Sequence, residues 1–272
     1  MTSMPYAEVI GDPIEHSLSP IIHTFWLEAL GIEASYGRRQ IKREELPAYL
    51  VERRADENWC GSNITMPLKL DAVALADEAT DRAVAAGAAN VLMIREGRLA
   101  AANTDVGAIA ILLTRLHESK ARMGSVTLLG NGGAARAALV ALKLVGISAV
   151  RIQARDLAEA VKLAVEFGLQ VEPAIFTAPI ATDGLINATP LGMPGRDCLN
   201  CELDRMPADG WLIDMVTEPA VTPLIEAARK RGLKTLGGLD MLVEQAATSF
   251  KLFFEADAPR DRDEQLWQLL KR

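Results

Sequence analysis

The strongest constraint on the fold is residues 126–140, VTLLGNGGAARAALV. Its first four residues are aliphatic or β-branched and predict a buried strand, whereas its alanine-rich end predicts a helix. The turn between them contains Gly130, Gly132 and Gly133, and a turn without side chains lets an anionic ligand approach backbone N–H groups at a helix N-terminus. With Ala135 as the small packing residue, the spacing matches the G-x-G-x-x-G/A fingerprint of dinucleotide-binding turns. Such turns also serve as plain strand-to-helix connections, so the rest of the chain has to show whether this turn binds a dinucleotide.

At 272 residues, the chain exceeds an average domain of about 150 residues, so two domains are the leading expectation. No apolar run approaches the roughly 20 residues that span a bilayer, and the N-terminus lacks the basic start and apolar core of a secretory signal. Three cysteines argue against a disulfide framework and indicate a cytoplasmic protein. The formal charge of -7 argues against a broad nucleic-acid surface but permits an anionic small substrate that local donors bind.

Two serines lie where the first helix is expected to begin. Ser19 followed by Pro20 is typical of a helix start, because serine can cap the first turn and proline loses nothing at the first helical position. Ser17 has no such structural explanation. Two hydroxyls beside a helix N-terminus would also suit a carboxylate. His16 and His23 have no metal-site spacing and are interpreted as structural.

Residues 35–64 predict a strand, a helix and a further strand, and polar residues follow the last strand. Asn63 and Thr65 stand at its carboxyl end, where ligands bind in α/β sheets. Lys69 falls in the first turn of the next helix, an unfavourable place for a cation. It is either a solvated lysine, or a proton donor or an anchor for an oxygen-rich ligand.

Asp105 follows a β-hairpin predicted at residues 90–102 and precedes a helix at 106–116. It is either an ordinary N-cap or an acid-base partner of Lys69.

Several motifs resemble those of the shikimate dehydrogenase family, including its quinate/shikimate relatives. In chain order they are GDPIEHSLSPIIH, SNITMPLK, AAN, NTDVGA, LGNGGAARAA, INATPLGM, DMVTEPAVTPLIEAARKRG and GGLDMLVEQAATSF. The likeness covers nearly the whole chain. It implies a bilobed enzyme that moves a hydride between a nicotinamide and a hydroxyl-bearing carbon of a cyclohexene carboxylic acid, without a metal.

The resemblance also implies roles for individual residues. The implied substrate ligands are Ser17 and Ser19 for the carboxylate, and Asn63, Thr65, Asn90 and Gln245 for the ring hydroxyls. Lys69 and Asp105 are the implied catalytic pair. The chain departs from the family pattern at Thr217, where a tyrosine is usual, and at Val91, where a threonine is usual. Losing a tyrosine that reaches the substrate would remove a hydrogen-bond partner, so these departures bear on substrate identity.

The end of the strand at residues 150–153 bears on the choice of cofactor. Arg155 matches the arginine of the family's NADP-binding pattern and suits a 2′-phosphate, whereas Asp156 would repel a phosphate and suits the ribose of NAD. Asp156 could equally cap the following helix. NADP is therefore preferred, with NAD as the alternative. The expected cofactor ligands are Gly130, Asn131, Gly132, Gly133, Ala134, Arg155, Met215 and Gly238, the last two from the resemblance.

We predict an α/β protein with a substrate-binding and catalytic domain at residues 1–105, completed by 237–272, and a Rossmann domain at 106–236. The predicted partner is a small carboxylic acid, and the predicted assembly is a monomer or homodimer. The pair Cys198 and Cys201 is interpreted as an incidental loop feature, because no second pair follows. The opposing hypothesis is a family-like protein with weak activity that binds a metabolite in a regulatory role.

Overall fold

The computed structural model describes residues 4–168, 170–175 and 178–271. The chain forms two compact units: one combines residues up to Thr104 with those from Val243 onward, and the other spans Asp105–Leu242. Each unit has its own six-stranded sheet flanked by helices. The predicted α/β class is therefore confirmed.

The first unit is built on a mixed sheet with the strand order β2-β1-β3-β5-β6-β4. Its strands are β1 (Tyr6–Gly11), β2 (Ser35–Gln40), β3 (Trp59–Ile64), β4 (Glu78–Ala79), β5 (Val91–Arg95) and β6 (Arg98–Ala102). Its helices are α1 (Ser19–Leu30), η1 (Arg43–Glu45), α2 (Leu46–Arg54), α3 (Lys69–Leu75), α4 (Asp81–Ala86), most of α9 (Gly238–Phe254), η2 (Arg260–Arg262) and α10 (Asp263–Leu270). Strand β1 runs parallel to β2 and β3, whereas β5 runs antiparallel to β3 and β6.

The β5–β6 hairpin turns at Glu96 and Gly97, which have φ angles of 52° and 75°. Two left-handed residues in a two-residue loop give a turn whose twist matches that of the flanking strands. The predicted hairpin is thus confirmed.

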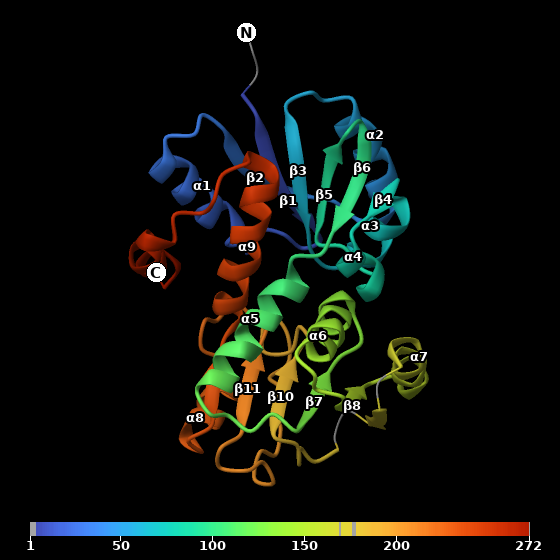
Figure 1. Ribbon diagram of the computed structural model, residues 1–272, viewed down its shortest axis with the longest axis vertical. Coiled ribbons are helices and arrows are strands. Elements are labelled where there is room, and N and C mark those ends of the chain that lie inside the picture. The colour runs from blue at the N-terminus through green and yellow to red at the C-terminus, as the bar shows by residue number, and fades with distance from the viewer. Residues whose placement is uncertain (1–3, 169, 176–177, 272) are drawn as a thin grey trace. The chain divides into compact units, whose positions relative to one another are not determined.

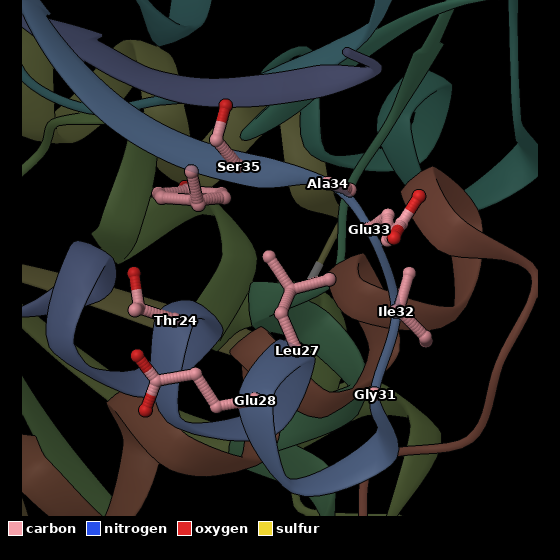
Figure 2. Close-up of a pocket in the computed structure, with 9 residues that line it drawn as sticks. Thr24, Leu27, Glu28, Gly31, Ile32, Glu33, Ala34 and Ser35 are labelled. Carbon is pink, nitrogen blue, oxygen red and sulfur yellow. The ribbon is translucent and has the colours of Figure 1, made fainter.

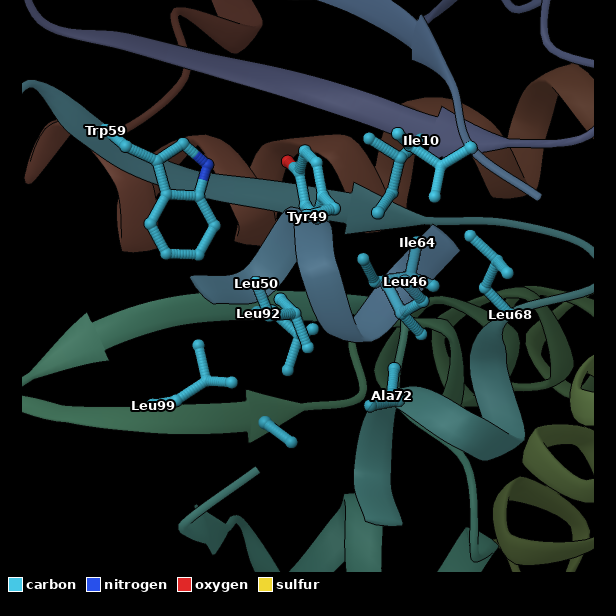
Figure 3. Packing of buried hydrophobic residues seen from close by; sticks show 13 residues of the cluster. Ile10, Leu46, Tyr49, Leu50, Trp59, Ile64, Leu68, Ala72, Leu92 and Leu99 are labelled. Atoms are coloured by element: carbon cyan, nitrogen blue, oxygen red, sulfur yellow. The ribbon is translucent and has the colours of Figure 1, made fainter. Parts of the chain in front are cut away.

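Both faces of the first sheet are covered. Helices α2 and α3 pack their apolar side chains on one face, where Leu46, Leu68 and Leu92 are fully buried (Figure 3). Helices α1 and α9 lie over the other face (Figure 1), where the Trp26 and Phe250 rings meet edge to face with centroids 5.5 Å apart. Helix α10 packs on α1, so the end of the chain completes the first unit.

The second unit has a wholly parallel sheet with the order β12-β11-β10-β7-β8-β9. Its strands are β7 (Ser125–Leu129), β8 (Ala149–Ala154), β9 (Gln170–Ile175), β10 (Gly184–Asn187), β11 (Trp211–Asp214) and β12 (Lys234–Leu236). Its helices are α5 (Asp105–Glu118), α6 (Gly133–Leu144), α7 (Leu157–Phe167) and α8 (Pro223–Lys230), with the first residues of α9. Counted from β7, the order reads 3-2-1-4-5-6, that of a Rossmann fold, which confirms the fold predicted from the glycine turn.

Several helix starts follow local capping chemistry. The Thr222 hydroxyl accepts from the Ile225 N–H at the start of α8, and the Asp156 carboxylate accepts from two N–H groups at the start of α7. The expected cap at Ser19 is wrong, because Ser19 is already the first residue of α1 and its hydroxyl makes no cap bond. Within the described ranges of the chain, no helix has the length and apolar character needed to cross a membrane.

Candidate functional site

A buried array of amides and hydroxyls lies at the carboxyl end of β3 in the first unit. The Asn90 side chain forms two hydrogen bonds with Thr104. Its Oδ1 accepts from the Thr104 N–H at 2.7 Å, and its Nδ2 donates to Thr104 Oγ1 at 2.8 Å. Asn90 Nδ2 also donates to Gln245 Oε1 at 3.3 Å. Asn63 Nδ2 donates to Ser249 Oγ at 2.9 Å. The structure therefore brings together three predicted substrate ligands from β3, the loop before β5 and helix α9.

Tyr36 on β2 links this array to the start of α1. Its hydroxyl donates to Asn63 Oδ1 at 2.6 Å, and the Ser19 side chain lies close to the same hydroxyl. Burial raises the pKa of the Tyr36 phenol well above its ordinary value, and the nearby Glu8 carboxylate adds to this effect. The phenol therefore keeps its proton and acts as a donor.

Lys69 is attached to the same region through its backbone. It is the first residue of α3, and its carbonyl oxygen accepts from the Ala89 N–H at 2.8 Å. The next residue, Asn90, accepts from the Ile64 N–H through its own carbonyl at 2.8 Å. These two bonds hold the beginning of α3 beside the segments that carry Asn63 and Asn90.

The predicted carboxylate ligands Ser17 and Ser19 lie at the N-terminal end of α1. Ser17 is half-buried, and its Oγ accepts from the Ser19 N–H at 3.4 Å. Ser19 is buried and its hydroxyl faces Tyr36.

Thr65 lies against the end of β1. Its N–H donates to the Ile10 carbonyl at 2.9 Å, and a Cβ placed on Gly11 would lie 2.4 Å from the Thr65 methyl group. Glycine at position 11 is therefore what lets this loop approach the strand.

The glycine turn of the second unit has the geometry that an anion site needs. Gly130 has a φ of +103°, and a Cβ there would lie 3.1 Å from the Ala188 carbonyl oxygen. A Cβ on Gly132 would meet no atom within 4 Å, so the turn is open on that side. Gly132 precedes the first helical residue, Gly133, and the twelve-residue helix α6 aims its first N–H groups there. These residues fit a diphosphate. Asn131 is exposed in the turn, and Ala134 is half-buried in the first turn of α6.

Arg155 and Asp156, the two charged residues of the cofactor prediction, directly follow β8 and have different surroundings. Arg155 is exposed. Asp156 Oδ1 accepts from the Ala158 and Glu159 N–H groups at 2.9 and 3.2 Å. The alternative in which Asp156 caps the following helix is therefore confirmed.

Asp214, at the end of β11, organises the segment that carries Met215. Its buried carboxylate accepts from Asn187 Nδ2 at 2.8 Å, Thr222 Oγ1 at 2.6 Å and the Val216 N–H at 3.2 Å. Burial raises the pKa of this carboxyl, and the three donors oppose the shift. A Cβ on Gly238 would lie 2.3 Å from the Val216 carbonyl oxygen, so only glycine permits this close approach. Met215 and Gly238 are thus brought together.

Lys69 belongs to the first unit, and Asp105 is the first residue of the second. Asp105 is buried at the first position of α5, next in the chain to the Thr104 of the polar array. Of the two departures from the family pattern, Val91 is fully buried beside Asn63 in the β3–β5 ladder, and Thr217 is half-buried.

A hollow of about 400 Å³ lies where the C-terminal half of α1 meets the start of β2. Figure 2 shows Thr24 and Leu27 of the helix directed toward the strand that carries Ser35. The predicted substrate ligands do not line this hollow.

Cys198 and Cys201 are free thiols in the loop after β10. Burial, with the charge of Asp214 adding to it, raises the pKa of Cys201 to about 11. Leu199 between them is packed in the core with Cys201 against it. A half-buried thiol with a raised pKa is poorly reactive, which supports the interpretation as a loop feature.

The sequence analysis missed Tyr36, Thr104 and Ser249, the hydroxyls that join the predicted ligands. The sequence of β2 does not indicate that the Tyr36 hydroxyl bonds to an amide, and a serine within a mainly apolar helix such as α9 does not reveal its hydrogen-bond partner. Thr104 precedes Asp105 and the helix predicted at 106–116, and this position was the one sequence feature that could have marked it as a site residue.

Comparison with known proteins gives consistent matches along the chain. Residues 9–92 match the shikimate dehydrogenase substrate binding domain, and residues 238–266 match the shikimate 5′-dehydrogenase C-terminal domain. The shikimate dehydrogenase (NADP(+)) of Sphingopyxis alaskensis is 42% identical over 268 residues, which cover 98% of this chain and 97% of that protein.

Solved structures resemble the chain over its whole length. Shikimate 5-dehydrogenase from Thermus thermophilus, in complex with NADP(H) and shikimate, has a TM-score of 0.85 at 33% identity and covers 98% of this chain and 100% of that one. The ligand-free 5-ketofructose reductase of a Gluconobacter species has a TM-score of 0.85 at 25% identity and covers 99% and 100%. With a 42% identical relative across nearly its full length, the chain belongs to the shikimate dehydrogenase family.

Proposed function

We propose that this protein is an NADP-dependent oxidoreductase that interconverts 3-dehydroshikimate and shikimate. The observation that carries the proposal is the buried array around Asn63, Asn90 and Gln245, placed beside the start of the helix that begins with Lys69. A polyhydroxylated ring needs several hydrogen-bonding groups in fixed positions, and buried amides held by hydrogen bonds within the protein supply them.

In this proposal the substrate carboxylate is held by the hydroxyls of Ser17 and Ser19 at the N-terminus of α1, where the helix dipole favours an anion. The ring hydroxyls bind Asn63, Thr65, Asn90 and Gln245. Asn63 is already bonded to Ser249, and Asn90 to Gln245, so the directions of these three side chains are fixed before the substrate arrives, which lowers the ordering cost of binding.

Lys69 and Asp105 act as the acid-base pair. When shikimate is oxidised, its hydroxyl proton passes to this pair as the carbon loses a hydride; in the reverse direction the pair returns the proton to the developing alkoxide. NADP, when bound, supplies the hydride acceptor or donor.

The glycine turn and the first turn of α6 hold the diphosphate through Gly130, Asn131, Gly132, Gly133 and Ala134, and Met215 and Gly238 approach the nicotinamide. Arg155 pairs with the 2′-phosphate. One carboxylate oxygen of Asp156 accepts the N–H groups that cap α7. Because that oxygen is not directed at a ribose, the cap supports NADP over NAD as the cofactor.

We place the enzyme in the cytoplasm, where Cys60, Cys198 and Cys201 persist as thiols. As a monomer or homodimer, it needs no macromolecular partner for this reaction.

An absorbance assay at the reduced-nicotinamide band tests the proposal with shikimate, quinate and the reverse substrate 3-dehydroshikimate. Turnover of shikimate with NADP, and a smaller kcat/KM with quinate, is the expected result. Binding of shikimate without turnover would instead favour the regulatory alternative. A higher kcat/KM for the reduction of 5-ketofructose than for 3-dehydroshikimate would contradict the proposal and would favour a keto sugar as substrate, as in the 5-ketofructose reductase among its structural relatives.

The cofactor choice has its own test. Replacing Arg155 by alanine should raise the KM for NADP about tenfold or more and leave the KM for NAD nearly unchanged, because only NADP has the phosphate. Equal effects on both cofactors would contradict the assignment.

A further inference from the structure

We propose that Tyr36 and Ser249 are positioning residues that hold the Asn63 side chain with its amide oxygen available to the substrate. The inference rests on the proposed function, in which Asn63 binds a ring hydroxyl. It adds two residues and a hydrogen-bond direction to that site.

The oxygen side of the Asn63 amide faces Tyr36. The phenol is 6% exposed, and its hydroxyl lies 2.6 Å from Asn63 Oδ1. Burial keeps the phenol protonated, and an amide oxygen can only accept, so the phenol hydrogen is directed at Asn63.

The nitrogen side of the amide is fixed by two acceptors. Asn63 Nδ2 lies 2.9 Å from Ser249 Oγ and 3.3 Å from the Asn90 carbonyl oxygen. A carbonyl oxygen only accepts, so a flipped amide would bring two acceptors together. Ser249 donates its own hydrogen to the Gln245 carbonyl at 3.0 Å, which turns its lone pairs toward Asn63.

Both amide hydrogens of Asn63 are therefore used within the protein, whereas Oδ1 has a second lone pair. Asn63 consequently accepts a hydrogen bond from a substrate hydroxyl and does not donate one. Ser249 is fully buried and Tyr36 nearly so, and both act on the substrate through Asn63.

Tyr36→Phe and Ser249→Ala each remove one of these hydroxyls, and Tyr49→Phe is the matched control. Tyr49 is also a buried tyrosine of the first unit, but its hydroxyl bonds to Glu8 and Ser62. Each of the two test variants should raise the KM for shikimate about three- to tenfold, the effect of one lost hydrogen bond, with the KM for NADP within twofold of wild type. Tyr49→Phe should lower the melting temperature and leave the KM for shikimate unchanged.

A double-mutant cycle with Asn63→Ala separates positioning from general damage. Asn63→Ala should raise the KM for shikimate, and adding Ser249→Ala should then have little further effect. Additive effects, or an equal rise in KM in the Tyr49→Phe control, would overturn the positioning role while the proposed function stands. An unchanged KM in Asn63→Ala, or absence of shikimate turnover in the wild-type enzyme, would remove the assigned role of Asn63 and the inference with it.

Discussion

His23 shows how burial alone can determine the behaviour of a titratable side chain. It is fully buried, its ring stacks on Tyr36 at a centroid distance of 3.9 Å, and neither ring nitrogen has a hydrogen-bond partner among the described residues. Burial lowers its pKa from 6.5 to about 3. His23 therefore serves as an aromatic core residue, as the sequence analysis expected of a histidine without metal-site spacing.

This lowered pKa predicts an acid-sensitive stability. Protons bind His23 in the unfolded chain but not in the folded one, so its stabilisation is complete above pH 6.5 and is lost as the pH falls toward 3. The loss amounts to about 2 kcal/mol at pH 5 relative to pH 8. Urea unfolding of His23→Phe across this range should show a correspondingly weaker pH dependence. The exposed His117→Gln serves as the control and should retain the wild-type profile; identical profiles for all three proteins would contradict the account.

Lys69 supports a second prediction at the same scale. Lys69→Ala should lower kcat about a hundredfold or more, because general acid-base catalysis contributes that much, while the melting temperature changes little for a half-buried side chain at a helix start. Steady-state kinetics with shikimate and a thermal melt measure both. A variant with full activity would exclude Lys69 from proton transfer.

The strand pattern pointed to Asn63, and the family resemblance supplied Asn90 and Gln245, but neither indicated the hydroxyls that bond to these amides. Asn63 stands at the carboxyl end of a recognisable strand, whereas its partners Tyr36 and Ser249 lie 27 and 186 positions away in the chain. Sequence spacing carries no information about contacts at such separations, because the fold creates them.

Among the elements, the most reliable predictions came from strong local signals. The hairpin at residues 90–102 and the helix at 106–116 were both expected, and the structure has them as β5–β6 and α5. Strand β9 was not expected, since a short edge strand after a helix has little pattern of its own. Helix α9 begins at Gly238, a residue of low helix propensity that the close approach of the Val216 carbonyl requires at this position.

The cap of α7 provides a test that separates hydrogen bonding from charge. Asp156→Ala should destabilise the protein by about 1 kcal/mol, because it removes the bonds to Ala158 and Glu159 N–H groups. Asp156→Asn should keep most of this stability, since asparagine caps helices equally well. Urea unfolding of the two variants measures the difference, and equal losses would rule out the cap as the cause.

At the scale of the whole molecule, the first unit depends on both ends of the chain. Helix α9 contributes the fully buried Phe250 to its core, and Gly61 leaves room for the ring of Phe253, which a Cβ would meet at 2.4 Å. The second unit, Asp105–Leu242, is in contrast one continuous stretch.

A chain that ends at Leu242 should therefore lose the first unit and keep the second. Removal of Ser249, Phe250 and Phe253 exposes the face of the first sheet that α9 covers, and the hydrophobic cost exceeds what a domain of this size can lose. Limited proteolysis should degrade residues 1–104 and leave a protected fragment near 105–242, whereas the full-length chain resists throughout. Protection of both units in the truncated chain would contradict this dependence.

The return of the chain to its starting unit also sets an order of events during synthesis. When residue 104 leaves the ribosome, the first sheet cannot yet pack against α9, because α9 is translated only after every strand of the second sheet. The sheet of the second unit comes from one continuous stretch of chain, so all its strands are translated before α9. The apolar surface around Trp26 in the nascent first unit therefore stays uncovered until α9 has been translated, and the first unit can complete its fold only then.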